Sequence, residues 1–351
     1  MSDEKIKSLM KDLGLKALKG VEKATPYIVV GRLYKKIFYK RTETDPFLMF
    51  HYEDYPGLIR EDSSFTSNHY QRLQGYFYHY KNYDQNKVII FAHGYGNGHA
   101  RYLDLIEYLC RNGFLVYSYD VTSFDESEGE GIDSFPQAII DLSFAIKHIK
   151  GEARTKNSNI YLVGHSMGGY AVGCNLNIYH DIDKAVILSG FNQSGELIKA
   201  QGEKWAGESA PDFVKYVDSY EKYFYPNYYQ MTVVDGLKNS KNTKAIFVHS
   251  KDDNTVLYDQ SMGQYIKNFK DDKRVELITY KNRGHGTIYY SDKGRKYFEE
   301  QHKLYKKYCK SAGNITKLDK INYLDEHLDK KIWLDMLDHN LLDDIINFLK
   351  K

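Results

Sequence analysis

Short apolar runs alternate with helical patterns through the middle of the chain, and this alternation limits the fold more than any other feature of the sequence. The runs are rich in β-branched and aromatic residues and are bounded by Gly, Asp or Ser, which is typical of strands buried on both faces. We expect six such strands, at residues 88–92, 114–119, 160–163, 185–188, 245–248 and 275–280.

Apolar residues between these strands recur at helical spacing, as in segments 102–109 and 138–146. Strands that alternate with helices form a parallel sheet with helices on both faces. Segment 70–80 alternates around Gly75, and we expect it to supply antiparallel edge strands. The predicted fold class is therefore α/β, with a mostly parallel central sheet.

Two regions interrupt the alternation. Segment 192–243 separates two predicted strands by about 50 residues, where a connection usually takes ~2–6, and its aromatic residues near helical spacing predict a helical cap or lid. In segment 313–351, apolar residues at steps of three and four predict amphipathic helices. The cap aromatics are Phe213, Tyr216, Tyr220, Tyr223 and Phe224, with Trp205 nearby, and the C-terminal stripe is Leu334, Leu337, Leu341, Ile345 and Phe348.

These patterns predict an N-terminal helical extension at 1–60, a core in two halves at 61–191 and 244–312, a cap at 192–243, and C-terminal helices at 313–351. Residues 1–41 carry 11 Lys and Arg against 4 Asp and Glu, with an apolar stripe at residues 6–13. Such a helix either lies on an anionic membrane surface or docks on its own domain. We favour docking, because Asp12 and Gly14 weaken the pattern.

Charge and cysteine content exclude several classes of protein. A formal net charge of +2 over 351 residues does not suit a protein that coats nucleic acid. No apolar run approaches the ~18 residues of a membrane span, and the N-terminus has no signal-peptide core. The three cysteines form no Cys-x-x-Cys pair, so we expect reduced thiols in a cytoplasmic protein. No His-Glu-x-x-His or Gly-x-Gly-x-x-Gly motif occurs, and we expect no metal and no cofactor; oligomeric state is not predicted.

A Gly-x-Ser-x-Gly motif follows the predicted strand 160–163 and precedes a helical pattern. In a strand–turn–helix context this motif places a serine on a sharp, strained turn, with its Oγ above the sheet. Gly164 and Gly168 give the clearance that such a turn needs, His165 packs beneath it, and the N–H of Met167 faces the substrate. Ser166 is therefore the candidate nucleophile.

A serine nucleophile needs a base, and the base needs an orienting carboxylate. Asp252 and Asp253 follow the predicted strand 245–248, and His285 follows strand 275–280 between two glycines. Loops after parallel strands converge on one edge of the sheet. We therefore expect Ser166, one of the two aspartates and His285 to meet there.

A glycine-rich loop, His93-Gly94-Tyr95-Gly96-Asn97-Gly98, follows the first central strand. Its glycines allow close approach to a substrate, with Gly94 next to the candidate donor. The N–H of Tyr95 can join that of Met167 to bind a developing oxyanion.

Together these segments resemble the α/β-hydrolase superfamily, closest to its serine-aminopeptidase-like, monoglyceride-lipase-like and lysophospholipase-like members. The resemblance covers about residues 65–310 and implies a lid at 192–243. It also implies acyl transfer, with Ser166 as nucleophile, His285 as proton shuttle and Asp253 as its orienting group. The family's Gly-x-x-Asp-x-x-Val segment favours Asp253 over Asp252. The matching segments are 93–96, Asp120, 164–169, Ser250 to Val256, and 284–285.

The chain departs from the family at one loop, where Ser123-Phe124-Asp125-Glu126-Ser127 replaces the frequent Gly-x-Gly-x-Ser. The oxyanion loop also lacks the His-Gly-Gly-Pro-Gly of proline iminopeptidases. The resemblance implies a serine hydrolase of carboxylic esters, with monoacylglycerols or lysophospholipids as candidate substrates. Alternatives are a thioesterase or peptidase on the same three residues, and a catalytically silent binding protein of this fold.

Overall fold

The computed structural model describes residue 31, residues 34–206 and residues 210–351, and the side chains of residues 203–213 and 215 lie outside this description. The predicted N-terminal stripe at residues 6–13 falls outside it too, as do the side chains of Trp205 and Phe213. The N-terminal helix prediction therefore stays a prediction.

One eight-stranded sheet forms the centre of the described chain, in the order β1-β2-β4-β3-β5-β6-β7-β8. β1 and β2 pair antiparallel, β2 pairs antiparallel with β4, and all other pairs are parallel. The strands are β1 (Ile59–Thr66), β2 (Arg72–His79), β3 (Lys87–Ala92), β4 (Leu115–Tyr119), β5 (Asn159–His165), β6 (Lys184–Leu188), β7 (Lys244–Ser250) and β8 (Val275–Tyr280).

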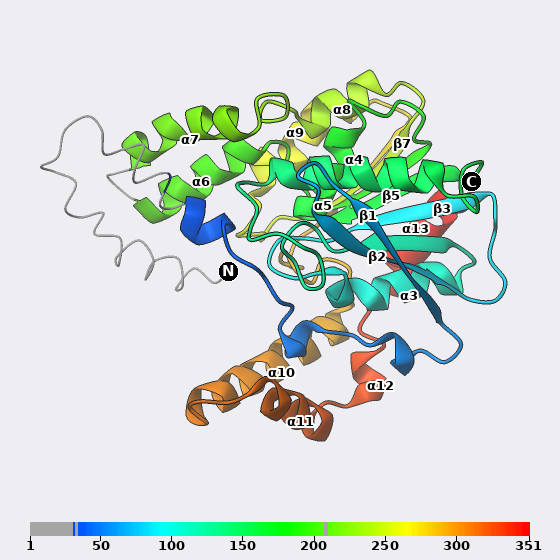
Figure 1. Cartoon of the computed structure of the whole chain (residues 1–351), viewed down its shortest axis with the longest axis vertical. Coiled ribbons are helices and arrows are strands. Elements are labelled where there is room, and N and C mark those ends of the chain that lie inside the picture. Colours follow the sequence, from blue (N-terminus) through cyan, green and yellow to red (C-terminus); the bar gives the residue numbers. More distant parts are fainter. Residues whose placement is uncertain (1–30, 32–33, 207–209) are drawn as a thin grey trace, which may run out of the picture.

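Helices cover both faces of the sheet, and each face has its own apolar core (Figure 1). One core contains residues of α4 (Pro136–Gly151), α5 (Met167–Asn175) and α9 (Met262–Phe269). The other contains residues of α3 (Leu103–Arg111), α10 (Asp292–Ser311) and α13 (His339–Lys350). Because β3 to β7 are buried on both faces, their sequences read as unbroken apolar runs.

The predicted fold class is confirmed, and the six predicted strands are β3 to β8. The predicted antiparallel edge is also present, with β2 between β1 and β4. β1 was not predicted, because only Phe65 of its eight residues is buried and the strand shows no apolar alternation.

Segment 192–243 contains three helices, α6 (Ser194–Ala206), α7 (Ala210–Phe224) and α8 (Val233–Asn239). In Figure 1, α6 and α7 extend beyond the sheet, next to the N-terminal helical segment at residues 34–38. That these helices act as a lid stays a prediction.

The C-terminal part contains α11 (Lys317–His327), α12 (Lys330–Trp333) and α13. The apolar stripe read from the sequence does not lie on one helix. Asp338 caps the N-terminus of α13, so Leu334 and Leu337 precede that helix, and Leu337 forms a β-bridge with Tyr290. In the described part of the chain, no helix is both long enough and apolar enough to cross a membrane.

Candidate active site

Ser166 stands on a strained turn between β5 and α5. Its φ of 55° and ψ of −117° lie in a region that residues with side chains rarely adopt. A Cβ added at Gly164 would lie 2.5 Å from the backbone of Gly168, and one at Gly168 would overlap the carbonyl of Ala92 on β3. The two glycines therefore allow the chain to turn sharply here, which carries the serine above the end of the sheet.

The three residues Ser166, His285 and Asp253, here called the triad, are joined by hydrogen bonds. His285 Nε2 lies 2.8 Å from Ser166 Oγ, and His285 Nδ1 lies 2.7 Å from Asp253 Oδ2. Ser166 follows β5, Asp253 follows β7 and His285 follows β8, so the carboxyl edge of the parallel sheet brings them together. An imidazole in this position can accept the serine proton while the carboxylate holds its other nitrogen.

Asp253 is held as a buried carboxylate. Its Oδ1 accepts hydrogen bonds from the N–H groups of Thr255 and Val256, each at 2.8 Å. Burial alone would raise the pKa of Asp253, but the charge of His285 and its hydrogen bond outweigh burial and lower that pKa. His249, also buried, lies 3.5 Å from Oδ2 and adds to the same effect. Asp253 therefore stays ionised while it faces His285.

Asp252 binds the backbone of the loop that carries His285, whereas Asp253 binds the imidazole. Its Oδ1 accepts hydrogen bonds from the N–H groups of Arg283, at 3.1 Å, and Gly284, at 3.0 Å. The hydroxyl of Ser250 also donates to Asp252. Asp252 thus anchors the loop that carries His285 and does not contact the imidazole in any hydrogen bond described for it.

The glycine-rich loop after β3 lies against this site. A Cβ added at Gly94 would lie 3.2 Å from the Cβ of Ser166. Gly96 has a φ of 94°, which favours glycine. Met167 is the first residue of α5, so its N–H has no acceptor within that helix. The loop and the helix N-terminus therefore border the serine from two sides, as an oxyanion site requires.

A chain of hydrogen bonds runs beneath the turn. The N–H of Gly94 donates to the hydroxyl of Tyr102, at 3.1 Å, and that hydroxyl lies 2.9 Å from His165 Nδ1. His165 Nε2 lies 2.9 Å from the carbonyl oxygen of His285. Burial, with a smaller contribution from His285, lowers the pKa of His165 to about 3, so this imidazole is neutral and supports the loop of His285.

Arg101 is a supporting residue that the sequence did not point to. It is buried, and its guanidinium donates to the hydroxyls of Tyr289 and Tyr290, at 3.1 and 2.8 Å, and to the carbonyl of Gly286, at 3.1 Å. The side chain thus joins the start of α3 to the loop of His285. No local motif marks such a residue, because its partners lie more than 180 residues away.

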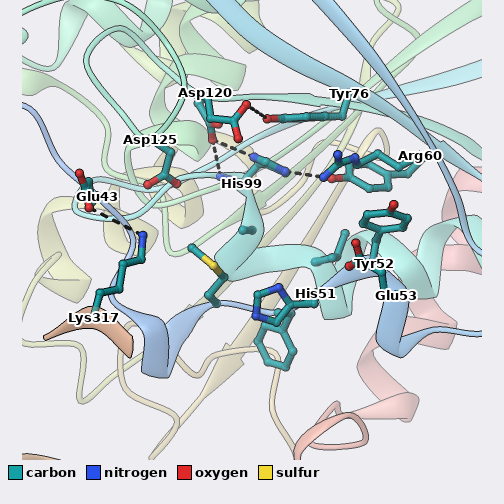
Figure 2. A pocket seen from close by; sticks show the side chains of 16 residues that line it. Glu43, His51, Tyr52, Glu53, Arg60, Tyr76, His99, Asp120, Asp125 and Lys317 are labelled. Carbon is teal, nitrogen blue, oxygen red and sulfur yellow. Dashed lines mark hydrogen bonds and ion pairs between the residues drawn. The ribbon is translucent and has the colours of Figure 1, made fainter. Parts of the chain in front are cut away.

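A cavity of about 320 Å³ has His99, Asp120 and Asp125 in its lining (Figure 2). There His99 Nδ1 lies 2.8 Å from buried Asp120, one of the residues that carry the family resemblance, and Tyr76 donates to Glu126 at 3.0 Å. Of the described residues that line this cavity, none belongs to the triad. Among residues 31, 34–206 and 210–351, no group of three His, Cys, Asp or Glu side chains is placed to hold a metal ion.

Comparisons with known proteins find similar hydrolases. Residues 83–214 match the family model of serine aminopeptidases, S33. The monoglyceride lipases of Rattus norvegicus and Homo sapiens are 30% and 28% identical to the chain over 122 residues, which is 34% of this chain and 36% of each relative. The match thus spans about a third of the length of these curated relatives.

A solved esterase of Pyrococcus furiosus has the same fold, with a TM-score of 0.54 and 20% identity over 76% of this chain and 98% of that one. The chain has the α/β-hydrolase fold. The fold of Est1E from Butyrivibrio proteoclasticus, solved with ferulic acid bound, is also similar to that of this chain, with a TM-score of 0.50 and 16% identity over 75% and 98% of the two chains.

The loop at which the chain departs from the Gly-x-Gly-x-Ser pattern contains two residues with positive φ. Ser123 and Asp125 stand at the two frequent glycine positions, and both have positive φ, 68° and 37°. Both residues therefore have a φ that glycine adopts more readily than a residue with a side chain.

Proposed function

We propose that this α/β-hydrolase cleaves carboxylic esters through an acyl-enzyme on Ser166. The observation that carries the proposal is the unbroken hydrogen-bonded path from Ser166 Oγ through the imidazole of His285 to Asp253. Three groups in this order convert a weak hydroxyl nucleophile into an effective one.

In the first half of the reaction, His285 Nε2 takes the proton of Ser166 as Oγ attacks the ester carbonyl. The N–H groups of Tyr95 and Met167 then stabilise the oxyanion of the tetrahedral intermediate. His285 returns the proton to the leaving alcohol, and the acyl group stays on Ser166. In the second half, a water attacks the acyl-enzyme with His285 again as base, which releases the acid and restores the serine.

We further propose an apolar acyl group, from a monoacylglycerol or a lysophospholipid. Aromatic rings form a connected row from Tyr95 into the core: Tyr95 to Phe135 at 5.6 Å, Phe135 to Phe191 at 5.2 Å, and Phe191 to Tyr170 at 4.5 Å between ring centres. Tyr95 and Phe135 are only partly buried, and their rings offer apolar surface for a hydrocarbon chain beside the glycine-rich loop. The partial likeness to monoglyceride lipases supports the same substrate class.

The purified chain is tested with p-nitrophenyl esters of increasing acyl length, with monoacylglycerol and lysophospholipid, and with a fluorophosphonate that labels activated serines. Ser166→Ala is expected to lose labelling and turnover. Ser158→Ala is the matched control, because its hydroxyl donates only to the carbonyl of Gln85, before β5 at the opposite edge of the sheet. Full esterase activity in Ser166→Ala would overturn the proposal.

The match to a serine aminopeptidase model favours peptide hydrolysis as the second candidate. The same triad attacks amides and thioesters, so a parallel panel of aminoacyl p-nitroanilides and acyl-CoA thioesters separates these reactions. A preference for the p-nitroanilides by kcat/KM would replace the esterase proposal with the peptidase one. A wild-type chain that neither turns over any substrate nor takes the label would support a binding role.

A further inference from the structure

Residues 37–44, here called the strap, run along the outer side of the glycine-rich loop and contact it at two points. The hydroxyl of Tyr95 donates to the carbonyl oxygen of Ile37. The N–H of Gly98 donates to Oγ1 of Thr44, at 2.8 Å. Both contacts are remote in sequence, and Thr44 is only 1% exposed. The strap thus contacts the loop at Tyr95, whose N–H is the predicted oxyanion donor, and at Gly98, three residues further along.

Asp125 orients the hydroxyl of Thr44. The N–H of Thr44 donates to Asp125 Oδ1 at 2.6 Å, and its hydroxyl donates to Oδ2 at 2.7 Å. Because the hydroxyl proton points to the carboxylate, a lone pair of Oγ1 is left for the N–H of Gly98. The N–H of Asp125 donates in turn to the carbonyl of Thr42, at 2.9 Å. The strap and the 123–127 loop therefore form one hydrogen-bonded unit.

This unit includes the 123–127 loop, where the chain lacks the Gly-x-Gly-x-Ser pattern that is frequent in the family it resembles. Asp125 stands where glycine is frequent and keeps a φ of 37°, a conformation that is costly for a residue with a side chain. Arg41 of the strap stabilises it by donating to the carbonyl of Asp125 at 2.7 Å and to those of Ser127 and Gly129 at 3.0 and 2.9 Å. The carboxylate gained at this position is the group that orients Thr44.

The glycine-rich loop fits tightly against these side chains. A Cβ at Gly98 would overlap Asp125 Oδ2 and lie 2.5 Å from Asp120 Oδ1. The next N–H, that of His99, donates to Asp120 Oδ1 at 2.8 Å. Figure 2 shows Asp120 and Asp125 beside His99 at one end of the cavity. The last amide of the loop and the amide that follows it therefore each bind a side chain of another segment, Thr44 oriented by Asp125 in one case and Asp120 in the other.

We propose that Thr44 is a positioning residue that, with Asp125, fixes the glycine-rich loop so that the N–H of Tyr95 faces the oxyanion. This inference rests on the proposed function, since the oxyanion is that of the Ser166 reaction. Loss of the Thr44 hydroxyl leaves the triad intact and displaces a donor that acts mainly in the transition state. The effect therefore falls on kcat more than on KM.

The test compares Thr44→Val with Thr44→Ser, which keeps the hydroxyl, and with Thr155→Val as matched control. Thr155 is also 1% exposed, and its hydroxyl donates to the carbonyl of Ile149 beyond the far end of the sheet. We expect Thr44→Val to lower kcat about 10- to 100-fold with little change in KM. Its inhibition constant for a trifluoromethyl ketone, whose adduct places an oxyanion at the same point, is expected to rise by a similar factor. Thr44→Ser is expected to restore both values, and Thr155→Val to leave them unchanged.

Hydrogen–deuterium exchange of the loop, followed at the amide of Gly98, gives a measurement that needs no turnover. We expect faster exchange in Thr44→Val than in wild type and Thr155→Val. An unchanged kcat, or a fall in kcat that Thr44→Ser does not reverse, overturns the inference. If the wild type shows no ester turnover, the proposed function fails, and hydrogen–deuterium exchange alone tests the strap. An exchange rate at Gly98 that is the same in Thr44→Val as in wild type then overturns the inference that Thr44 fixes the loop. If Thr44→Val does not fold, Tyr95→Phe breaks the second contact and is judged by the same measurements.

Discussion

Replacing Asp253 by asparagine is expected to abolish most of the activity while the fold survives. The amide oxygen of the new side chain can take the place of Oδ1 and keep both hydrogen bonds from the N–H groups of Thr255 and Val256. An NH₂ group then takes the place of Oδ2, which lies 2.7 Å from His285 Nδ1. That NH₂ group can only donate, so Nδ1 of His285 must become the acceptor. The proton moves to Nε2, which then cannot accept the proton of Ser166.

The expected loss follows from this inversion of the imidazole. Nε2 stays 2.8 Å from Ser166 Oγ, so geometry is kept and only the protonation pattern is wrong. A carboxylate-to-amide change of this kind lowers kcat by about 10³- to 10⁴-fold, which corresponds to about 4–5.5 kcal/mol in the barrier. The two retained backbone bonds limit the accompanying change in the free energy of unfolding to about 1 kcal/mol.

Steady-state hydrolysis of a p-nitrophenyl ester measures kcat, and thermal denaturation by circular dichroism measures stability. Asp252→Asn is the matched control. It alters the neighbouring carboxylate, which binds the N–H groups of Arg283 and Gly284 and not the imidazole. We expect this control to lose less than about tenfold in kcat, through loosening of the loop. An Asp253→Asn variant within tenfold of wild type, or an Asp252→Asn variant that loses more than Asp253→Asn, would refute the assignment.

Three further changes test buried positions of the fold. Gly168→Ala forces a Cβ into the carbonyl of Ala92 and is expected to lower the unfolding free energy by at least about 3 kcal/mol, measured by urea denaturation. Glu221 is buried in α7 with its pKa raised to about 7 by burial, so its ionisation destabilises the fold as the pH rises from about 4.5 through 7. Glu221→Gln should therefore stabilise the protein at pH 8 relative to wild type and lose that advantage near pH 5, as followed by melting temperature. Burial lowers the pKa of His165 to about 3, whereas in the unfolded state it is about 6.5. Between these pH values the unfolded state binds one more proton than the folded state, so the wild type loses stability as the pH falls from about 6.5 to 3. His165→Asn should flatten this part of the stability profile, and an unchanged slope in urea denaturation would contradict the burial of a neutral imidazole.

Local patterns of apolar residues predicted most of the strands of the fold. The core strands β3 to β7 are buried on both faces, so an unbroken apolar run identified each one without knowledge of its neighbours. β1 was not predicted because most of its side chains are exposed. Its backbone pairing with β2 does not require particular residue types, so the sequence does not show it. The spacing of the C-terminal apolar residues suggested one continuous stripe, but spacing alone does not show that Asp338 caps the start of a new helix.

The sequence by itself determined which chemical groups are available and in what order: a serine between glycines after β5, carboxylates after β7 and a histidine after β8. The parallel sheet then obliges these loops to share one edge. Only the tertiary structure decided which carboxylate faces the imidazole, because Asp252 and Asp253 differ by one step along the chain while their side chains bind different partners. It alone also placed Arg101 behind the His285 loop and Thr44 against Gly98. Those contacts join segments 185 and 54 residues apart, and a hydrogen bond of that range depends on how elements pack, which no local pattern of residues encodes.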